Sequence, residues 1–236
     1  MRPTLFLLPG LLCDAEIWSH QSAALSEFAE IVIPDFRFVR SIPAMAQLVL
    51  DGAPDRFSVA GHSMGGRVAL EVFRMAPERV ERLALLDTGI HPRRPGEEAG
   101  RQELIDLARR DGMEAMAARW LPPMLHSDHM ALLAPLTAMV KRSTPETFEN
   151  QQRALLDRPD ARAVLPAIHC PTLVLCGRED AWSPVAQHEE IAALIPGSKL
   201  VVIEECGHMS PVEQPDAVTN ALKSLWFSPA APGVVR

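Results

Sequence analysis

Cysteine is scarce and unpaired in this sequence. The 236 residues contain four cysteines, and no two of them form a C-x-x-C pair or show zinc-ligand spacing. So few cysteines in a chain of this length do not indicate a disulfide framework. We therefore expect reduced thiols that pack as small apolar side chains, a cytoplasmic location and no metal site.

Long apolar runs and basic runs are also missing. No stretch approaches the ~20 apolar residues that cross a bilayer. No lysine and arginine run marks a nucleic-acid or anionic-membrane surface, and the net charge of −7 disfavours such partners. Pro9-Gly10 interrupts the apolar start of the chain, so we expect no signal peptide. We expect no nucleic-acid or membrane partner, a monomer or homodimer, and a loose tail over Ser228–Arg236.

Short apolar runs alternate with helical periodicities over most of the chain. Runs of this kind, closed by turn residues, are typical of strands buried on both faces. The predicted strands are Thr4–Leu8, Ile31–Ile33, Phe57–Ala60, Arg82–Leu86, Thr172–Cys176 and Lys199–Ile203. The predicted helices are Ala15–Ala29, Ile42–Leu50, Arg67–Met75, Pro184–Leu194 and Pro215–Trp226. This alternation predicts an α/β fold with a mostly parallel sheet flanked by helices.

The alternation stops between about residue 89 and residue 167. No strand is predicted there, and apolar spacing favours four helices: Glu97–Arg110, Met113–Trp120, His129–Val140 and Pro145–Leu156. We therefore divide the chain into an α/β core of residues 1–89 and 168–236 and a helical insertion of residues 90–167.

A G-x-S-x-G motif at residues 61–65 lies between a predicted strand and a predicted helix. The turn at such a site is tight, and glycine on both sides of the serine removes side-chain clashes, so that the serine Oγ is held above the sheet edge. We predict Ser63 as a nucleophile. A serine hydroxyl needs a base to take its proton.

His208 is the predicted base, because it follows the last strand and lies on a loop at the carboxyl edge of the sheet. His62 adjoins the serine and cannot readily fold back to it. Asp180 follows the strand Thr172–Cys176, so its carboxylate can orient the His208 ring. Glu179 and Asp87 remain alternative acids.

Two backbone amides are candidates for stabilising an oxyanion. Met64 begins the helix after the serine, so its N–H points toward the reacting centre. The first strand ends in the turn Leu8-Pro9-Gly10-Leu11-Leu12, where the N–H of Leu11 is the second candidate.

Four segments together resemble the α/β-hydrolase superfamily over nearly the whole chain: LFLLPGLL (5–12), VAGHSMGGRVAL (59–70), PTLVLCGREDAWSP (171–184) and GHMSPVEQP (207–215). The last is similar to the family pattern G-H-x-x-x-x-E-x-P. The chain is most similar to small capped carboxylesterases and related acyl hydrolases. The resemblance implies a triad of Ser63, Asp180 and His208, an oxyanion hole at Leu11 and Met64, and a cap formed by the insertion.

The chain departs from that pattern in the loops that border the site. Many relatives carry His-Gly where this chain has Pro9-Gly10, and many carry D-x-R-G-x-G-x-S where it has only Asp35-Phe36-Arg37. The usual first two strands are also absent, because Thr4–Leu8 resembles the third. The loop after the second strand borders the pocket, so the substrates of those relatives do not carry over to this chain.

We therefore expect a serine hydrolase that cleaves a carboxylic ester or a similar acyl bond through an acyl-enzyme on Ser63, without a cofactor. The same triad can serve a thioesterase, a lactonase, a C–C bond hydrolase or lyase, and a ligand-binding receptor can keep a slow triad.

The substrate is expected to be a small, apolar acyl compound. Predicted substrate contacts are Leu12, Trp120, Trp182 and Met209, and the insertion adds Met113, Met116, Met124 and Leu125 as lining candidates. Five arginines of the insertion can attract an acidic substrate or an acyl carrier, but we interpret them as a solvated helix face: Arg93, Arg94, Arg101, Arg109 and Arg110.

Overall fold

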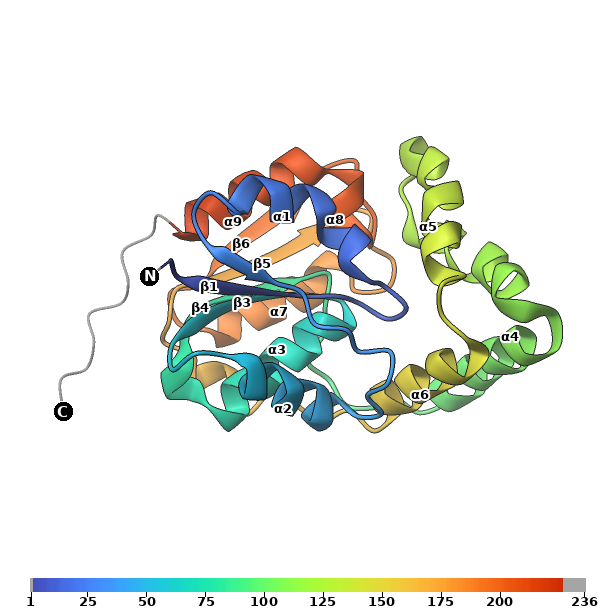
Figure 1. Ribbon diagram of the computed structural model, residues 1–236, viewed down its shortest axis with the longest axis horizontal. Helices are drawn as coiled ribbons and strands as arrows, with labels where there is room; N and C mark the ends of the chain where they lie inside the picture. Colours follow the sequence, from blue (N-terminus) through green and yellow to red (C-terminus); the bar gives the residue numbers. More distant parts are fainter. Residues whose placement is uncertain (1, 227–236) are drawn as a thin grey trace.

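The computed structural model describes residues 2–226. Within them, six strands form one sheet in the order β2-β1-β3-β4-β5-β6, and every neighbouring pair is parallel (Figure 1). The strands are β1 (Thr4–Leu8), β2 (Glu30–Val32), β3 (Phe57–His62), β4 (Val80–Leu86), β5 (Thr172–Gly177) and β6 (Lys199–Ile203). The predicted α/β fold with a parallel sheet is confirmed.

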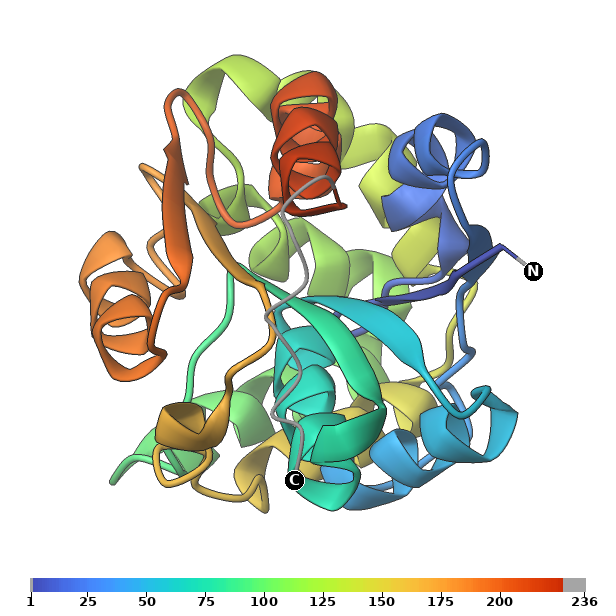
Figure 2. The same cartoon turned by 90° about the vertical axis from the view of Figure 1, so that its left-hand side faces the viewer.

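Helices cover both faces of this sheet. One face carries α1 (Ser19–Leu25) and α9 (Pro215–Trp226), and the other carries α2 (Ile42–Gly52), α3 (Met64–Met75) and α7 (Val185–Leu194) (Figures 1 and 2). Because both faces are covered, β1, β3 and β5 are buried at every position, which explains their continuous apolar runs.

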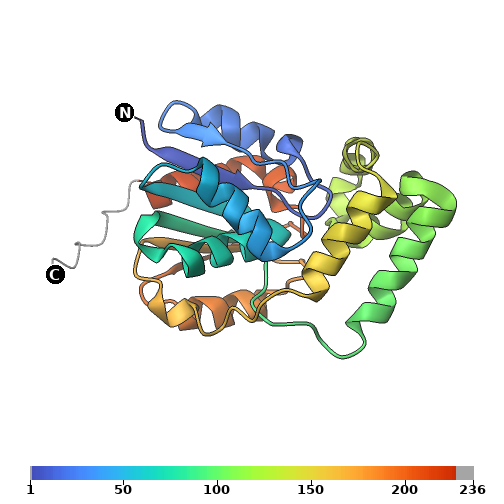
Figure 3. The ribbon, with the colours of Figure 1, turned by 60° about the horizontal axis from the view of Figure 1, so that its bottom comes forward.

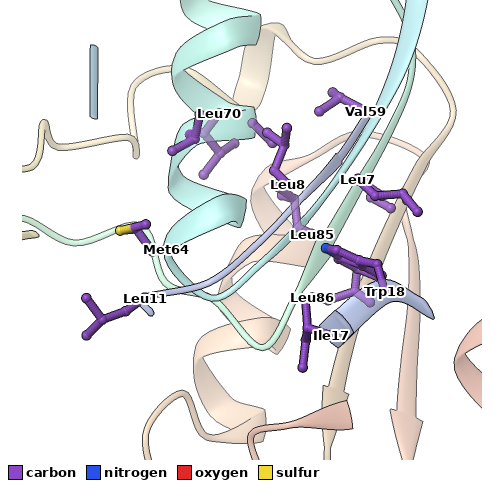
Figure 4. Close-up of a cluster of buried hydrophobic side chains, with 14 of the residues drawn as sticks. Leu7, Leu8, Leu11, Ile17, Trp18, Val59, Met64, Leu70, Leu85 and Leu86 are labelled. Carbon is purple, nitrogen blue, oxygen red and sulfur yellow. The ribbon is translucent and has the colours of Figure 1, made fainter. Parts of the chain in front are cut away.

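The core lies between these layers. Figure 4 shows leucines of β1 and β4 packed between Leu70 of α3 and the side chains of Ile17 and Trp18, which lie on the 3-10 helix η1 (Ala15–Trp18). The predicted helix Ala15–Ala29 is therefore two shorter elements, η1 and α1. The Asp14 side chain accepts from the Glu16 amide and caps the first of them.

Two elements near the carboxyl edge differ from prediction. Helix α3 begins at Met64, three residues earlier than expected. Gly65 and Gly66 are poor helix formers, which is why the prediction began after them, but close packing requires glycine at both positions. The short helix α8 (Ser210–Glu213) was not predicted, since four residues carry no periodic pattern.

The insertion lies beyond the carboxyl ends of the strands (Figures 1 and 3). Its helices are α4 (Glu97–Trp120), α5 (Leu133–Val140) and α6 (Pro145–Leu156), with 3-10 turns η3 (Pro122–Met124) and η4 (Ser127–Leu132). Gly112 has φ +88° and breaks α4 where we expected two helices to meet. No strand occurs between β4 and β5, and the assignment of residues 90–167 as a cap stays a prediction.

The short 3-10 helices η2 (Pro77–Arg79) and η5 (Leu165–Ala167) complete the described part of the fold. Within that part, none of the helices combines the length and apolarity needed to cross a bilayer. The tail predicted at Ser228–Arg236 lies outside the described residues.

Candidate active site

The carboxyl ends of three strands bring the predicted triad residues together. Ser63 directly follows β3, Asp180 follows β5, and His208 follows β6. The His208 Nδ1–H donates to Asp180 Oδ2 at 2.8 Å, and the Ser63 hydroxyl donates to His208 Nε2 at 2.9 Å. Because the ring proton is on Nδ1, the lone pair of Nε2 points toward the Ser63 hydroxyl, as proton abstraction requires.

Close backbone packing holds the serine in an unusual conformation. Ser63 has φ +54° and ψ −115°, a region that residues other than glycine rarely adopt. A Cβ at Gly61 would lie 2.2 Å from the Gly65 carbonyl oxygen, and a Cβ at Gly65 would lie 2.2 Å from the Leu8 carbonyl oxygen. Only glycine fits either position, so the motif glycines set both the turn and its contact with β1.

Asp180 and His208 each stabilise the charged form of the other. Burial alone would lower the pKa of His208, but the Asp180 carboxylate outweighs burial and raises that pKa above its usual value. Burial would raise the pKa of Asp180, yet His208 and the amides of Trp182 and Ser183, both 2.8 Å from Oδ1, lower it. Asp180 is therefore ionised at neutral pH and can stabilise an imidazolium.

The alternative acids have other partners. Glu179 accepts a hydrogen bond from the Cys206 amide at 3.0 Å and makes no contact with the His208 ring. Asp87, at the end of β4, is fully buried and accepts from the Gly177 amide at 3.1 Å and from the Ser210 hydroxyl at 2.5 Å. Burial, followed by the nearby Asp180, raises the pKa of Asp87 well above its usual value. Of the three carboxylates, only Asp180 bonds to His208.

His62 has a positioning role that the sequence reasoning missed. Its Nε2–H donates to the His208 carbonyl oxygen at 2.8 Å, and the two rings lie 5.4 Å apart. Burial and the neighbouring His208 lower the pKa of His62 to about 3, so the ring is neutral. The residue beside the nucleophile thus fixes the backbone of the predicted base.

Glu213 fixes the other side of the histidine loop. Its carboxylate accepts from the amides of Gly207 (3.1 Å) and Met209 (2.9 Å) on both sides of His208, and from His126 in the insertion (2.7 Å). The His208 amide donates to the Met124 carbonyl oxygen at 2.7 Å. Glu213 is the glutamate of the G-H-x-x-x-x-E-x-P pattern, so this pattern could have predicted its role from the sequence.

The two predicted oxyanion donors lie at this same edge. Leu11 and Met64 both line the space beside Ser63 and His208. No hydrogen bond is found for either amide in the part of the chain that the structure describes. Both N–H groups are therefore available to an oxygen bound next to the serine.

A cavity of about 420 Å³ lies between the sheet edge and the insertion, and Ser63 and His208 form part of its wall. Trp120 and Trp182, two predicted contacts, also line it and meet edge to face at 6.4 Å between ring centroids. The predicted contacts Leu12 and Met209 do not line it. Leu12 is buried and its amide donates to the Gln151 side chain, and Met209 is buried in the histidine loop.

More of the cavity lining is apolar than polar, as expected, but charged side chains that we did not expect there border it as well. Of the insertion's predicted lining residues, Trp120 and Met124 border the cavity, whereas Met113, Met116 and Leu125 do not. Arg94 and Arg101, which we interpreted as solvated, border it together with Arg67 and Arg158. Sequence spacing identified helix α4, but Arg94 precedes that helix, and the direction in which Arg101 points depends on how α4 packs against α6.

The two cysteines beside the site motifs are thiols and not thiolates at neutral pH. Cys13 and Cys206 flank the site motifs, and burial raises the pKa of both thiols, for Cys13 to about 12. Among residues 2–226 no group of three or more His, Cys, Asp or Glu side chains could hold a metal ion.

Residues 5–221 match the alpha/beta hydrolase family. A pimeloyl-[acyl-carrier protein] methyl ester esterase of Nitrosomonas europaea is 27% identical over 94% of this chain and 95% of its own length. A 3-oxoadipate enol-lactonase of Acinetobacter baylyi is 28% identical over 95% of this chain and 88% of its own. The structure of a thermophilic esterase from Thermogutta terrifontis superimposes with a TM-score of 0.85 at 30% identity, covering 95% of this chain and 90% of that one.

Proposed function

Because the chain belongs to the alpha/beta hydrolase family, we propose that it is a serine hydrolase that cleaves carboxylic esters through an acyl-enzyme on Ser63. The observation that carries this proposal is the unbroken hydrogen-bond line from Asp180 through His208 to Ser63, which ends at the wall of a cavity. The esterases among its relatives support the same reaction class.

In the first half-reaction, Ser63 Oγ attacks the ester carbonyl carbon while His208 Nε2 takes the hydroxyl proton. The carbonyl oxygen becomes an oxyanion that accepts hydrogen bonds from the amides of Leu11 and Met64, each worth roughly 3 kcal/mol in comparable sites. His208 then gives its proton to the leaving alcohol, and the C–O bond of the ester breaks. Asp180 keeps the ring oriented throughout.

In the second half-reaction, water replaces the alcohol. His208 takes a proton from the water, whose oxygen attacks the acyl carbon, and the same two amides hold the second oxyanion. Collapse of this intermediate returns the proton to Ser63 Oγ and releases the carboxylic acid. The cavity has room for a small ester, and Trp120 and Trp182 form an apolar part of its lining.

A lactone is a second candidate substrate, favoured by the enol-lactonase relative. The bonds made and broken are the same, but the leaving hydroxyl stays tethered to the acyl chain throughout, so that water releases a single hydroxy acid. An oligomeric state of monomer or homodimer and a cytoplasmic location also remain proposals.

Hydrolysis of p-nitrophenyl esters from acetate to dodecanoate tests the proposal, with Ser63→Ala as the control. We expect turnover by the wild-type chain and its loss in the variant, and the optimum length measures the accessible part of the cavity. Folded wild-type protein that hydrolyses neither these esters nor a lactone series would contradict the proposal.

A further inference from the structure

One wall of the cavity carries more positive than negative charge. Four guanidinium groups border it: Arg67, Arg94, Arg101 and Arg158. Glu97 and Asp87 are the carboxyl groups among the lining residues. Asp87 already accepts hydrogen bonds from the Gly177 amide and the Ser210 hydroxyl. Glu97 is therefore the one ionised carboxylate available to four cations in this wall.

Glu97 is already saturated by two of these arginines. Arg158 donates to both of its carboxylate oxygens at 2.7 Å, and Arg101 donates to Oε1 at 2.8 Å. Burial would raise the pKa of Glu97, but these hydrogen bonds, led by those from Arg158, lower it to about 2. Arg101 also bonds to the Gln152 side chain. These two guanidinium groups have little donor capacity left for a ligand.

Arg67 and Arg94 have no carboxylate partner among residues 2–226. Arg67 lies one turn after Ser63 on α3, and its one side-chain hydrogen bond goes to the His91 carbonyl oxygen at 3.0 Å. Burial and the nearby Arg158 lower the pKa of Arg67 to about 9. Arg94 is exposed at the cavity, and its side chain has no hydrogen bond or ion pair within the described chain. For Arg67, a partly buried cation without a bonded carboxylate is costly unless a ligand supplies one. Arg94 carries no such cost, but its guanidinium donors are free for a ligand.

We propose that this wall is an anion subsite, in which Arg67 and Arg94 bind a carboxylate group carried by the ester substrate. This inference rests on the proposed function and names its substrate class: a small ester with a free carboxylate at its far end. The planar guanidinium of arginine matches a carboxylate through paired N–H donors, and such charge-assisted bonds orient a ligand as well as bind it.

Matched substrates test the subsite directly. Monomethyl adipate carries the carboxylate on the acyl side and 4-acetoxybutanoate carries it on the alcohol side. Each is compared with its neutral primary amide, which has nearly the same shape. We expect at least one carboxylate to exceed its amide by roughly tenfold or more in kcat/KM, the range typical of a charge-assisted hydrogen bond. The pair that shows the preference identifies the side of the ester that faces the arginines.

Arginine variants connect that preference to the wall. Arg94→Gln removes a side chain with no internal partner, so we expect the variant to fold normally. It should bring the ratio of kcat/KM for the carboxylate to kcat/KM for the amide close to one. Arg67→Gln should change this ratio in the same direction. Arg93→Gln is the matched control, because Arg93 pairs with Glu98 at the surface and does not border the cavity. Equal rates for acid and amide in both pairs, or a preference that survives both variants, would overturn the proposal.

A binding measurement separates failure of the subsite from failure of the proposed chemistry. Calorimetric titration with adipate, a product rather than a substrate, reports anion binding whether or not the chain hydrolyses esters. Binding that is lost in Arg94→Gln and kept in Arg93→Gln supports the subsite even without turnover. The protein could instead hydrolyse p-nitrophenyl acetate but neither bind adipate nor prefer the anionic substrates. That result would leave the hydrolase proposal standing and show that the subsite proposal is wrong.

Discussion

The two walls of the cavity are constructed in different ways. On the sheet side, contacts with the backbone hold the proposed catalytic residues: glycine contacts at the Ser63 turn, the His62 bond to the His208 carbonyl, and amides around Asp180. On the other side, arginine side chains from separate segments line the cavity, three of them from the insertion and Arg67 from α3. The sheet side therefore has the rigidity that acyl transfer needs, whereas the other side can change its charge pattern without disturbing the chemistry.

On the sheet side, the proposed triad acid Asp180 gives the largest expected effect. Asp180→Asn keeps the shape but removes the charge that orients His208, and we expect kcat to fall by about 10³–10⁴. Glu179→Gln is the matched control one residue away, because Glu179 contacts the Cys206 amide and not the ring. Steady-state ester hydrolysis measures both. Similar losses in the two variants would show that Asp180 has no special role.

The glycine contacts of the nucleophile turn predict a large loss of stability. Gly65→Ala places a methyl group 2.2 Å from the Leu8 carbonyl oxygen, and backbone must move to relieve this clash. We expect a loss of roughly 1–3 kcal/mol or more in the free energy of unfolding, with loss of activity. Gly52→Ala is the control, since a Cβ there meets nothing within 4 Å. Urea titrations compare them, and a Gly65→Ala protein as stable as Gly52→Ala would contradict the packing argument.

Glu213 joins the two walls, so its replacement tests how far the histidine loop depends on the insertion. Glu213→Gln replaces a charged acceptor of three amides with a neutral one. We expect a loss of about 1–3 kcal/mol in unfolding free energy and a reduced kcat with little change in KM. An increase in KM alone would mean that the loop shapes substrate binding and not the position of His208.

The pH profile gives the smallest effect. Protonated His208 cannot act as a base, so activity falls as pH decreases through its pKa. Because Asp180 raises that pKa above the ordinary 6.5, the acid limb of kcat/KM should have its midpoint above 6.5. Rates from pH 5 to 9 in buffers of constant ionic strength determine it. A midpoint at or below 6.5 would indicate that burial dominates over the carboxylate.

The sheet side could be predicted from the sequence because its constraints are local. The G-x-S-x-G turn and the residues that follow β5 and β6 occupy fixed places relative to strand ends, so topology alone brings Ser63, Asp180 and His208 to one edge. The roles of His62 and Glu213 depend on which way a loop folds, and single-residue spacing does not specify that.

The insertion side could be predicted only as helices. Apolar spacing located α4 and α6, and Gly112 separated the two halves of α4, but spacing does not determine which arginines face inward. Arg94 and Arg101 line the cavity while Arg93 does not, although all three are polar residues in one segment. Their orientation follows from packing between residues distant in the chain, such as Arg158 and Glu97.

In the proposed reaction, Ser63 forms the covalent intermediate. A fluorophosphonate probe reacts with an activated serine, and mass spectrometry of peptides then locates the adduct. We expect one adduct per chain on the peptide that contains Ser63, and a greatly slowed reaction in Asp180→Asn. An adduct on another residue, or unmodified Ser63 in folded, ester-hydrolysing protein, would contradict the assignment of Ser63 as the nucleophile.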